Sequence, residues 1–115
     1  MRIPTCLAAT LLAVLVLAGC GDGSRDEAEG PDLTITIDGD RVAPVAQQLE
    51  ALAGEPMRVL IRSDRPGELH VHSVPEQTFE FEAGDTTEDL VVDTPGVVHI
   101  EEHVSGVAVA QVEVK

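Results

Sequence analysis

From Leu33 onward, apolar and polar residues alternate with a period of two, and turn residues interrupt the alternation at short intervals. Valine, isoleucine and threonine are frequent in these stretches, which is typical of β-strands with one buried face. The alternation predicts strands at 33–37, 57–62, 68–73, 78–82, 90–92, 97–101 and 107–114. Seven or eight short strands in about 80 residues predict an all-β domain built as a two-sheet sandwich.

Two aromatic residues mark the predicted core. The stretch 78–82 places Phe79 and Phe81 on one face of a strand, and the chain has no tryptophan or tyrosine. Because aromatic side chains bury a large apolar area, we expect both phenylalanines to lie in the core.

One segment, residues 42–53, fits two kinds of structure. Its apolar residues at positions 45, 49, 52 and 53 have a helical spacing, and good helix formers lie between them. The same residues also fit a strand at 47–52. Both alternatives stay open on the sequence alone.

The first residues of the chain follow a different pattern. An apolar run begins at Leu7, after the positive charge of Arg2, and ends in Leu17-Ala18-Gly19-Cys20, which has the form of a bacterial lipobox. The run is too short to span a bilayer, which takes about 20 apolar residues. We therefore expect residues 1–19 to be a cleaved lipoprotein signal peptide and Cys20 to carry the lipid.

Residues 20–32 are expected to form a flexible acidic tether behind the lipid. The stretch after Cys20 reads GDGSRDEAEGPD, and it has too few apolar side chains to fold by itself. Two acyl chains suffice to hold a small domain on a membrane surface. The sequence therefore predicts a folded domain at 33–115, held by Cys20 on the extracytoplasmic face of the cell membrane.

Charge and cysteine content exclude several functions. Without Arg2, six basic residues stand against 21 acidic ones, a formal charge of −15, so we expect no nucleic acid as a partner. Cys6 lies in the leader and Cys20 would be acylated, which leaves no thiol for a disulfide or for catalysis. No glycine-rich phosphate loop follows a strand either, and an enzyme is not expected.

Four histidines fall in two groups, His70 with His72 and His99 with His103. Residues two or four apart in a strand point to the same face. His70 and His72 therefore share a face, as do His99, Glu101 and His103 if their strand is regular. Two imidazoles on one face could chelate copper(II) or zinc.

A simpler interpretation treats the histidines as surface residues. His70 and His72 would then be solvated on a polar face, with Leu69 and Val71 turned to the core. His99 would be an ordinary exposed residue of an alternating strand. Acidic pairs such as Glu101 and Glu102 are likewise interpreted as solvated residues.

Several motifs together resemble a known family. They are SD followed by ELHVH at 63–72, AG at 83–84, PGV at 95–97 and EHVSG at 102–106. In this combination and order the chain resembles the cupredoxin-like lipoproteins and domains of bacterial cell envelopes, over residues 33–115. The resemblance implies a Greek-key β-sandwich of the cupredoxin type.

The chain departs from the electron-transferring members of that family at the metal site. Glu102 stands where the resemblance places the copper-binding cysteine, and no methionine follows Met57, so a blue-copper site cannot form. What the resemblance leaves is a histidine site for copper(II) or zinc at His70, His72 and His103. His99 and Glu102 are secondary candidates.

The sequence leads to one main functional expectation and to alternatives from other classes. We expect a lipid-anchored extracytoplasmic protein that binds copper(II) or another divalent metal through its histidines. The alternatives are a metal-free structural or protein-interaction module of the cell envelope, and an accessory to iron uptake.

Overall fold

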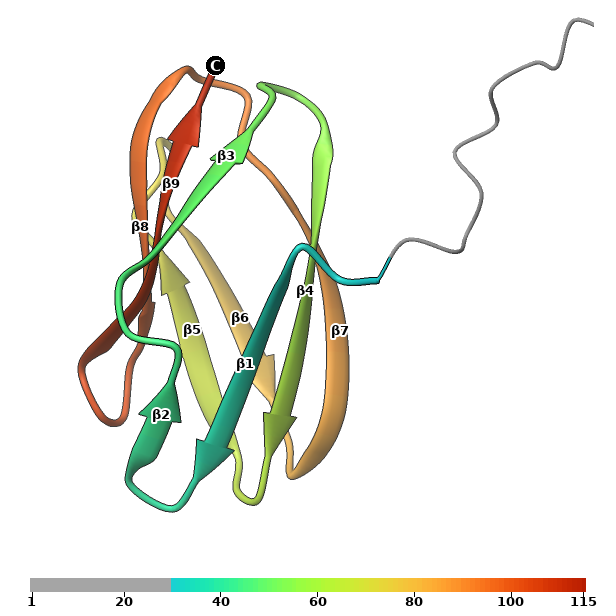
Figure 1. Ribbon diagram of the computed structural model, residues 1–115, viewed down its shortest axis with the longest axis vertical. Helices are drawn as coiled ribbons and strands as arrows, with labels where there is room; N and C mark the ends of the chain where they lie inside the picture. The colour runs from blue at the N-terminus through green and yellow to red at the C-terminus, as the bar shows by residue number, and fades with distance from the viewer. Residues whose placement is uncertain (1–29) are drawn as a thin grey trace, which may run out of the picture.

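The computed structural model describes residues 30–115, which form two β-sheets packed face to face (Figure 1). The predicted signal peptide, the predicted lipidation site at Cys20 and most of the predicted tether lie outside these residues. The described part of the chain contains no helix long and apolar enough to cross a membrane. The predicted all-β two-sheet sandwich is confirmed.

The two sheets contain nine strands between them. The four-stranded sheet has the order β2-β1-β4-β7, with β1 at Leu33–Asp38, β2 at Arg41–Ala43, β4 at Pro56–Ser63 and β7 at Gly84–Val91. The five-stranded sheet has the order β3-β9-β8-β5-β6, with β3 at Gln47–Ala51, β5 at Gly67–Val71, β6 at Gln77–Phe81, β8 at Gly96–Glu102 and β9 at Val107–Val114.

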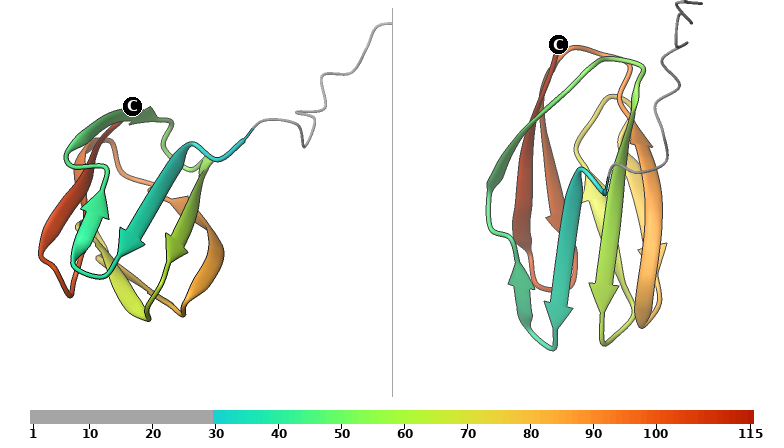
Figure 2. Two further views of the ribbon diagram at one scale, coloured as in Figure 1. Left: turned by 60° about the horizontal axis from the view of Figure 1, so that its bottom comes forward. Right: turned by 45° about the vertical axis from the view of Figure 1, so that its right-hand side comes forward.

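Strand pairing mixes local hairpins with parallel contacts between distant segments. The hairpins β1–β2, β5–β6 and β8–β9 are antiparallel, whereas β1 pairs with β4 and β3 with β9 in parallel. As a result the turns β1–β2, β4–β5 and β8–β9 meet at one end of the sandwich, which the left panel of Figure 2 brings forward. This end carries the contacts that matter most below.

The core fills the space between the sheets with the inward residues of the alternating strands. In β1 the pattern is regular, with Leu33, Ile35 and Ile37 buried and the residues between them exposed. Such alternation is what a sheet with one solvated face requires. The other buried apolar residues are Val42, Met57, Val59, Ile61, Leu69, Val71, Phe81, Leu90, Val92, Val98, Ile100, Val109, Ala110, Val112 and Val114.

The ambiguous segment 42–53 is extended. Its first two residues are the end of β2, and residues 47–51 form β3, which pairs in parallel with β9. A helix here would have collected its apolar side chains on one buried face, but Val45 is 70% exposed and Leu52 is 52% exposed. The strand alternative is confirmed, and the helical alternative is wrong.

The two phenylalanines differ in burial. Phe81 is 3% exposed and lies in the core, as predicted. Phe79 is only partly buried and packs against the edge of the core from β6, the outermost strand of its sheet. The expectation of full burial therefore holds for Phe81 alone.

Candidate metal centre

Strand β5 turns two chemically active side chains to the outside of the five-stranded sheet. Leu69 and Val71 are 2% and 1% exposed and belong to the core. Because successive strand residues face opposite ways, Glu68 and His70 lie on the outer face. The expectation that Leu69 and Val71 face the core is confirmed, and so is the outward position of His70.

The turn after β8 brings a third residue to the same place. The backbone N–H of His103 donates to the carbonyl oxygen of Glu68 at 2.9 Å, which ties the turn to β5. The imidazole of His103 stacks on that of His70, with ring centroids 4.4 Å apart. A further hydrogen bond joins His70 Nε2 to the Glu68 carboxylate. One ligand atom from each of these three residues lies within 4.8 Å of the others.

We call Glu68, His70 and His103 the histidine cluster. Zinc holds four ligands tetrahedrally at about 2.0–2.2 Å, which places neighbouring ligand atoms about 3.3 Å apart. The cluster therefore needs shifts of about an ångström to close on an ion. Because the two imidazole rings are stacked, their nitrogen lone pairs do not point at one common position, and one ring must tilt before both can bind the same ion. The ring of His103 has room to tilt, since His103 is exposed and lies in a turn.

His72 lies beside the histidine cluster but outside it. Its ring centroid is 6.4 Å from that of His70. Its Nε2 is 3.6 Å from the carboxylate of Glu101, and its Nδ1 is 3.8 Å from that of Glu76. Glu76 also approaches His70, at 3.8 Å from Nδ1. His72 thus lies next to the cluster among acidic side chains. The sequence predicted that His70 and His72 bind an ion together, whereas the geometry brings His103 closer to His70 than His72.

His99, a secondary candidate, is exposed on β8 opposite Gln111 of β9. Its backbone carbonyl accepts a hydrogen bond from the N–H of His72 at 2.9 Å. Within the described residues its side chain is not part of the histidine cluster.

Glu102, the other secondary candidate, points inward and is fully buried, so its interpretation as a solvated residue is wrong. Its carboxylate pairs with the guanidinium of Arg65 at 3.2 Å. Glu102 is therefore not brought into the histidine cluster, although it directly precedes His103.

The charge of Glu102 is strongly stabilised in this position. Burial by itself raises the pKa of a carboxyl group. Hydrogen bonds from Arg65, from the hydroxyl and backbone of Ser105 and from the backbone of Val104 outweigh burial and lower the pKa of Glu102 to about 2. In return, the hydrogen bond to Glu102 raises the pKa of Arg65.

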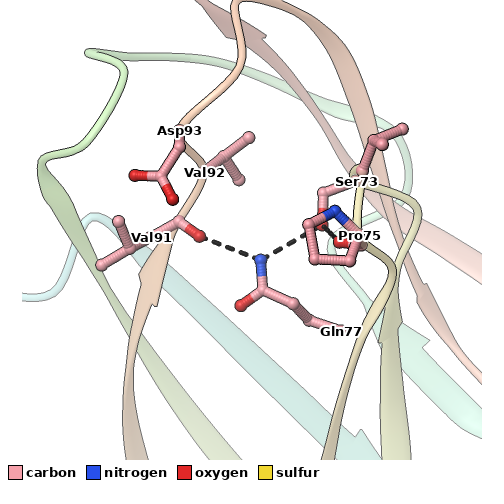
Figure 3. Close-up of a pocket in the computed structure, with 7 residues that line it drawn as sticks. Ser73, Pro75, Gln77, Val91, Val92 and Asp93 are labelled. Carbon is pink, nitrogen blue, oxygen red and sulfur yellow. Dashed lines mark hydrogen bonds between the residues drawn. The ribbon is translucent and has the colours of Figure 1, made fainter.

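A small pocket lies toward the other end of β5 (Figure 3). Its volume is about 260 Å³, and its lining residues are Ser73, Val74, Pro75, Gln77, Val91, Val92 and Asp93. The side-chain amide of Gln77 crosses it, donating to Ser73 Oγ and to the carbonyl of Val91. The amide nitrogen thereby links β6 to β7 of the other sheet, which is a structural role.

The comparisons with known proteins give a fold but no close relative. No protein-family model and no curated protein matches the chain. A multicopper oxidase from Pediococcus acidilactici matches 93% of this chain and 30% of its own, with a TM-score of 0.57 at 12% identity. The sandwich resembles the cupredoxin fold. At this identity the likeness concerns the fold alone, and the chain spans less than a third of the oxidase.

Two mutant amicyanin structures are also similar. An oxidised methionine-to-leucine mutant and a Cu(I) methionine-to-alanine mutant both give a TM-score of 0.49. Their identities are 12% and 14%, over 77% and 79% of this chain and 87% and 88% of theirs.

Sequence reasoning missed Glu68 as a candidate ligand and Arg65 as the partner of Glu102. The signal for Glu68 was present, because it stands two residues before His70 and so shares its face. The signal for a buried Glu102 was also present, since it continues the alternation of Val98 and Ile100. Nothing local pointed to Arg65, which lies 37 residues away in the chain.

Proposed function

We propose that this protein is a lipid-anchored extracytoplasmic metal-binding protein that holds one divalent ion, copper(II) or zinc, in the histidine cluster. The convergence of Glu68 and His70 from strand β5 with His103 from the turn after β8 carries the proposal. The anchor and the location at the extracytoplasmic face of the cell membrane are proposed from the lipobox at Cys20.

The chemistry of the donors determines which ions fit. Two imidazole nitrogens and a carboxylate oxygen suit copper(II) and zinc, whereas Cu(I) prefers thiolate and thioether ligands. Residues 30–115 contain no cysteine, and their one methionine, Met57, is 5% exposed in the core. Fast electron transfer by a blue-copper centre is therefore excluded, and holding or delivering a divalent ion is the activity that this donor set supports.

The acidic side chains around the cluster also favour the binding of cations. Glu76 and Glu101 lie within 4 Å of the neighbouring histidine nitrogens, and the chain as a whole carries a formal charge of −14. Negative potential raises the local concentration of a cation and speeds its capture.

Calorimetric titration of copper(II) and zinc into the full chain in detergent at pH 7.5 tests the proposal. We expect one ion per chain with submicromolar affinity, and loss of that binding in His70→Ala. The matched control is His99→Ala, which removes an exposed histidine of the same sheet and should leave binding unchanged. Absent binding to the wild type, or equal losses in the two variants, would refute the histidine cluster as the site.

A second candidate function follows from the ion pairs of the cluster. His70 already bonds to Glu68, and His72 beside the cluster lies near Glu101, so these two imidazoles have a carboxylate partner without a metal. A metal-free interaction module of the cell envelope is the function that these pairs favour. Failure of the titration would support it and direct the search to protein partners.

A further inference from the structure

We propose that Glu102 is a positioning residue for the metal centre, which together with Arg65 holds the turn that carries His103. This inference rests on the proposed function, because it gives a role in metal binding to two residues that do not touch the ion. It is argued from the contacts that Glu102 makes with the turn on one side and with Arg65 on the other.

Glu102 organises the β8–β9 turn from inside. Its Oε1 accepts from the backbone N–H of Val104 at 3.2 Å, and its Oε2 accepts from the N–H and hydroxyl of Ser105 at 2.8 and 2.6 Å. Its backbone carbonyl accepts from Gly106 at 2.9 Å. Every residue from 104 to 106 therefore donates a hydrogen bond to Glu102. His103 is the first residue of this turn, and its backbone path is fixed as a consequence.

Arg65 holds the carboxylate of Glu102 in place. Its guanidinium reaches both oxygens, at 3.3 and 3.2 Å, and its Nε donates to the carbonyl of Gly39 at 2.9 Å. Gly39 belongs to the β1–β2 turn of the other sheet, so Arg65 connects the two sheets at this end of the sandwich. A buried charge is costly unless it is paired, and both members of this pair are therefore needed.

The opposite side of the turn faces the histidine cluster. The backbone of His103 is bonded to Glu68, and its ring stacks on His70. Thus His103 is held between the Glu68 carbonyl on one side and the turn that Glu102 organises on the other, and Glu102 helps to set where the third ligand lies relative to the other two. Fixing a ligand before binding reduces the entropy lost when the ion binds, and partners outside the ligand shell typically change metal affinity by about 10–100-fold.

The test compares three variants of the full chain in detergent with copper(II) as the probe. Glu102→Gln removes the charge, and we expect an affinity about 10–100-fold lower. Ser105→Ala removes the two hydrogen bonds of the Ser105 hydroxyl, the one it donates to Glu102 and the one it accepts from the N–H of Val107, and we expect a smaller loss in the same direction. The control is Val59→Ala, a core change in the other sheet, which should lower stability but change affinity less than about twofold.

A spectroscopic readout separates positioning from general destabilisation. The nitrogen hyperfine pattern of bound copper(II) should change from two nitrogens to one in Glu102→Gln and remain at two in Val59→Ala. Unchanged affinity and an unchanged two-nitrogen pattern in a folded Glu102→Gln protein would overturn the proposal. If that variant does not fold, Ser105→Ala decides in the same way.

A metal-free measurement keeps the two proposals apart. The stacked rings predict a proton–proton Overhauser effect between His70 and His103 in the wild type without metal. We expect this effect to weaken in Ser105→Ala and to persist in Val59→Ala. If the wild type binds no ion, the proposed function fails, and the ring contact alone decides whether Glu102 positions His103: its persistence in both Glu102→Gln and Ser105→Ala would refute the positioning role.

Discussion

The imidazole of His103 lies on that of His70 with the ring planes inclined by 17°. The two residues come from different elements, the β8–β9 turn and β5, and they are 33 positions apart in the chain. The contact therefore depends on the tertiary structure, whereas the proximity of His70 and His72 follows from strand geometry alone. Two sets of metal ligands can therefore be compared: the histidine cluster, which contains His70 and His103, and the pair of His70 and His72.

The first prediction concerns these two sets. His103→Ala should weaken copper(II) binding at least tenfold, because it removes a ligand of the histidine cluster. His72→Ala should weaken it less than about threefold, since His72 lies outside the cluster and acts through charge. Calorimetric titration measures both. If His72→Ala weakened copper(II) binding more than His103→Ala, the site would instead be the pair of His70 and His72 that the sequence predicted.

The second prediction is a pH dependence of stability that comes from Glu102. Its pKa in the folded protein is lowered from 4.5 to about 2, so its charge contributes stability above about pH 4.5, and this contribution is lost as the pH falls toward 2. In Glu102→Gln the contribution is absent. The difference in free energy of unfolding between wild type and variant should shrink over this range, by up to about 3 kcal/mol.

Urea titrations between pH 2 and pH 5, with a chelator present, measure this difference. The other carboxyl groups titrate in both proteins and cancel. A difference that stays constant over this range would contradict the buried, charged state of Glu102.

The third prediction concerns the close packing at Gly67. A Cβ atom there would lie 2.5 Å from Cζ of Phe81 and 3.1 Å from Nη1 of Arg65. Phe81 is buried and cannot move aside freely. Gly67→Ala should therefore lower the free energy of unfolding by about 1–3 kcal/mol.

Chemical denaturation of Gly67→Ala provides the measurement. Gly30→Ala is the matched control, because a Cβ at Gly30 meets nothing within 4 Å, and a change below about 0.5 kcal/mol is expected there. Equal stabilities of the two variants would mean that Phe81 is more mobile than its burial indicates.

The fourth prediction compares the two phenylalanines. Phe81→Ala should cost about 3–5 kcal/mol by leaving a cavity in the core. Phe79→Ala should cost clearly less, since Phe79 is only partly buried on an edge strand. Thermal and urea unfolding measure both changes. A reversed order would contradict the placement of β6 against the core.

Much of the fold could be predicted because most strands have one buried and one solvated face. Strand β1 and strand β9 were found almost to the residue. Strand β7 was predicted only at its end, because Leu90 is its one fully buried side chain. The rest of this strand is held by backbone pairing with β4 and by exposed ion pairs, Arg58 with Asp89 and Arg62 with Asp85. Such contacts leave no apolar period in the sequence.

The candidate site shows the same limit. Alternation was enough to place His70 on the outer face, and it would have been enough for Glu68. The stacking of His103 on His70 depends on where the β8–β9 turn lies, and the burial of Glu102 depends on Arg65, a partner from a distant turn. The stacking of the two rings and the pairing of Glu102 with Arg65 leave no local signal, so the sequence named both histidines of the site but did not assemble them with Glu68.

The parallel pairing of β3 with β9 has a consequence for the time course of folding. Gln47 pairs with Ala110, so about sixty residues must be looped out before the first contact of this ladder forms. Closing so long a loop loses chain entropy before any contact compensates for it, and structures with such pairings fold slowly. Strand β9 also lies between β3 and β8, so the five-stranded sheet stays divided until β9 arrives. We therefore expect the β8–β9 hairpin, and His103 in its turn, to reach its final position late in folding.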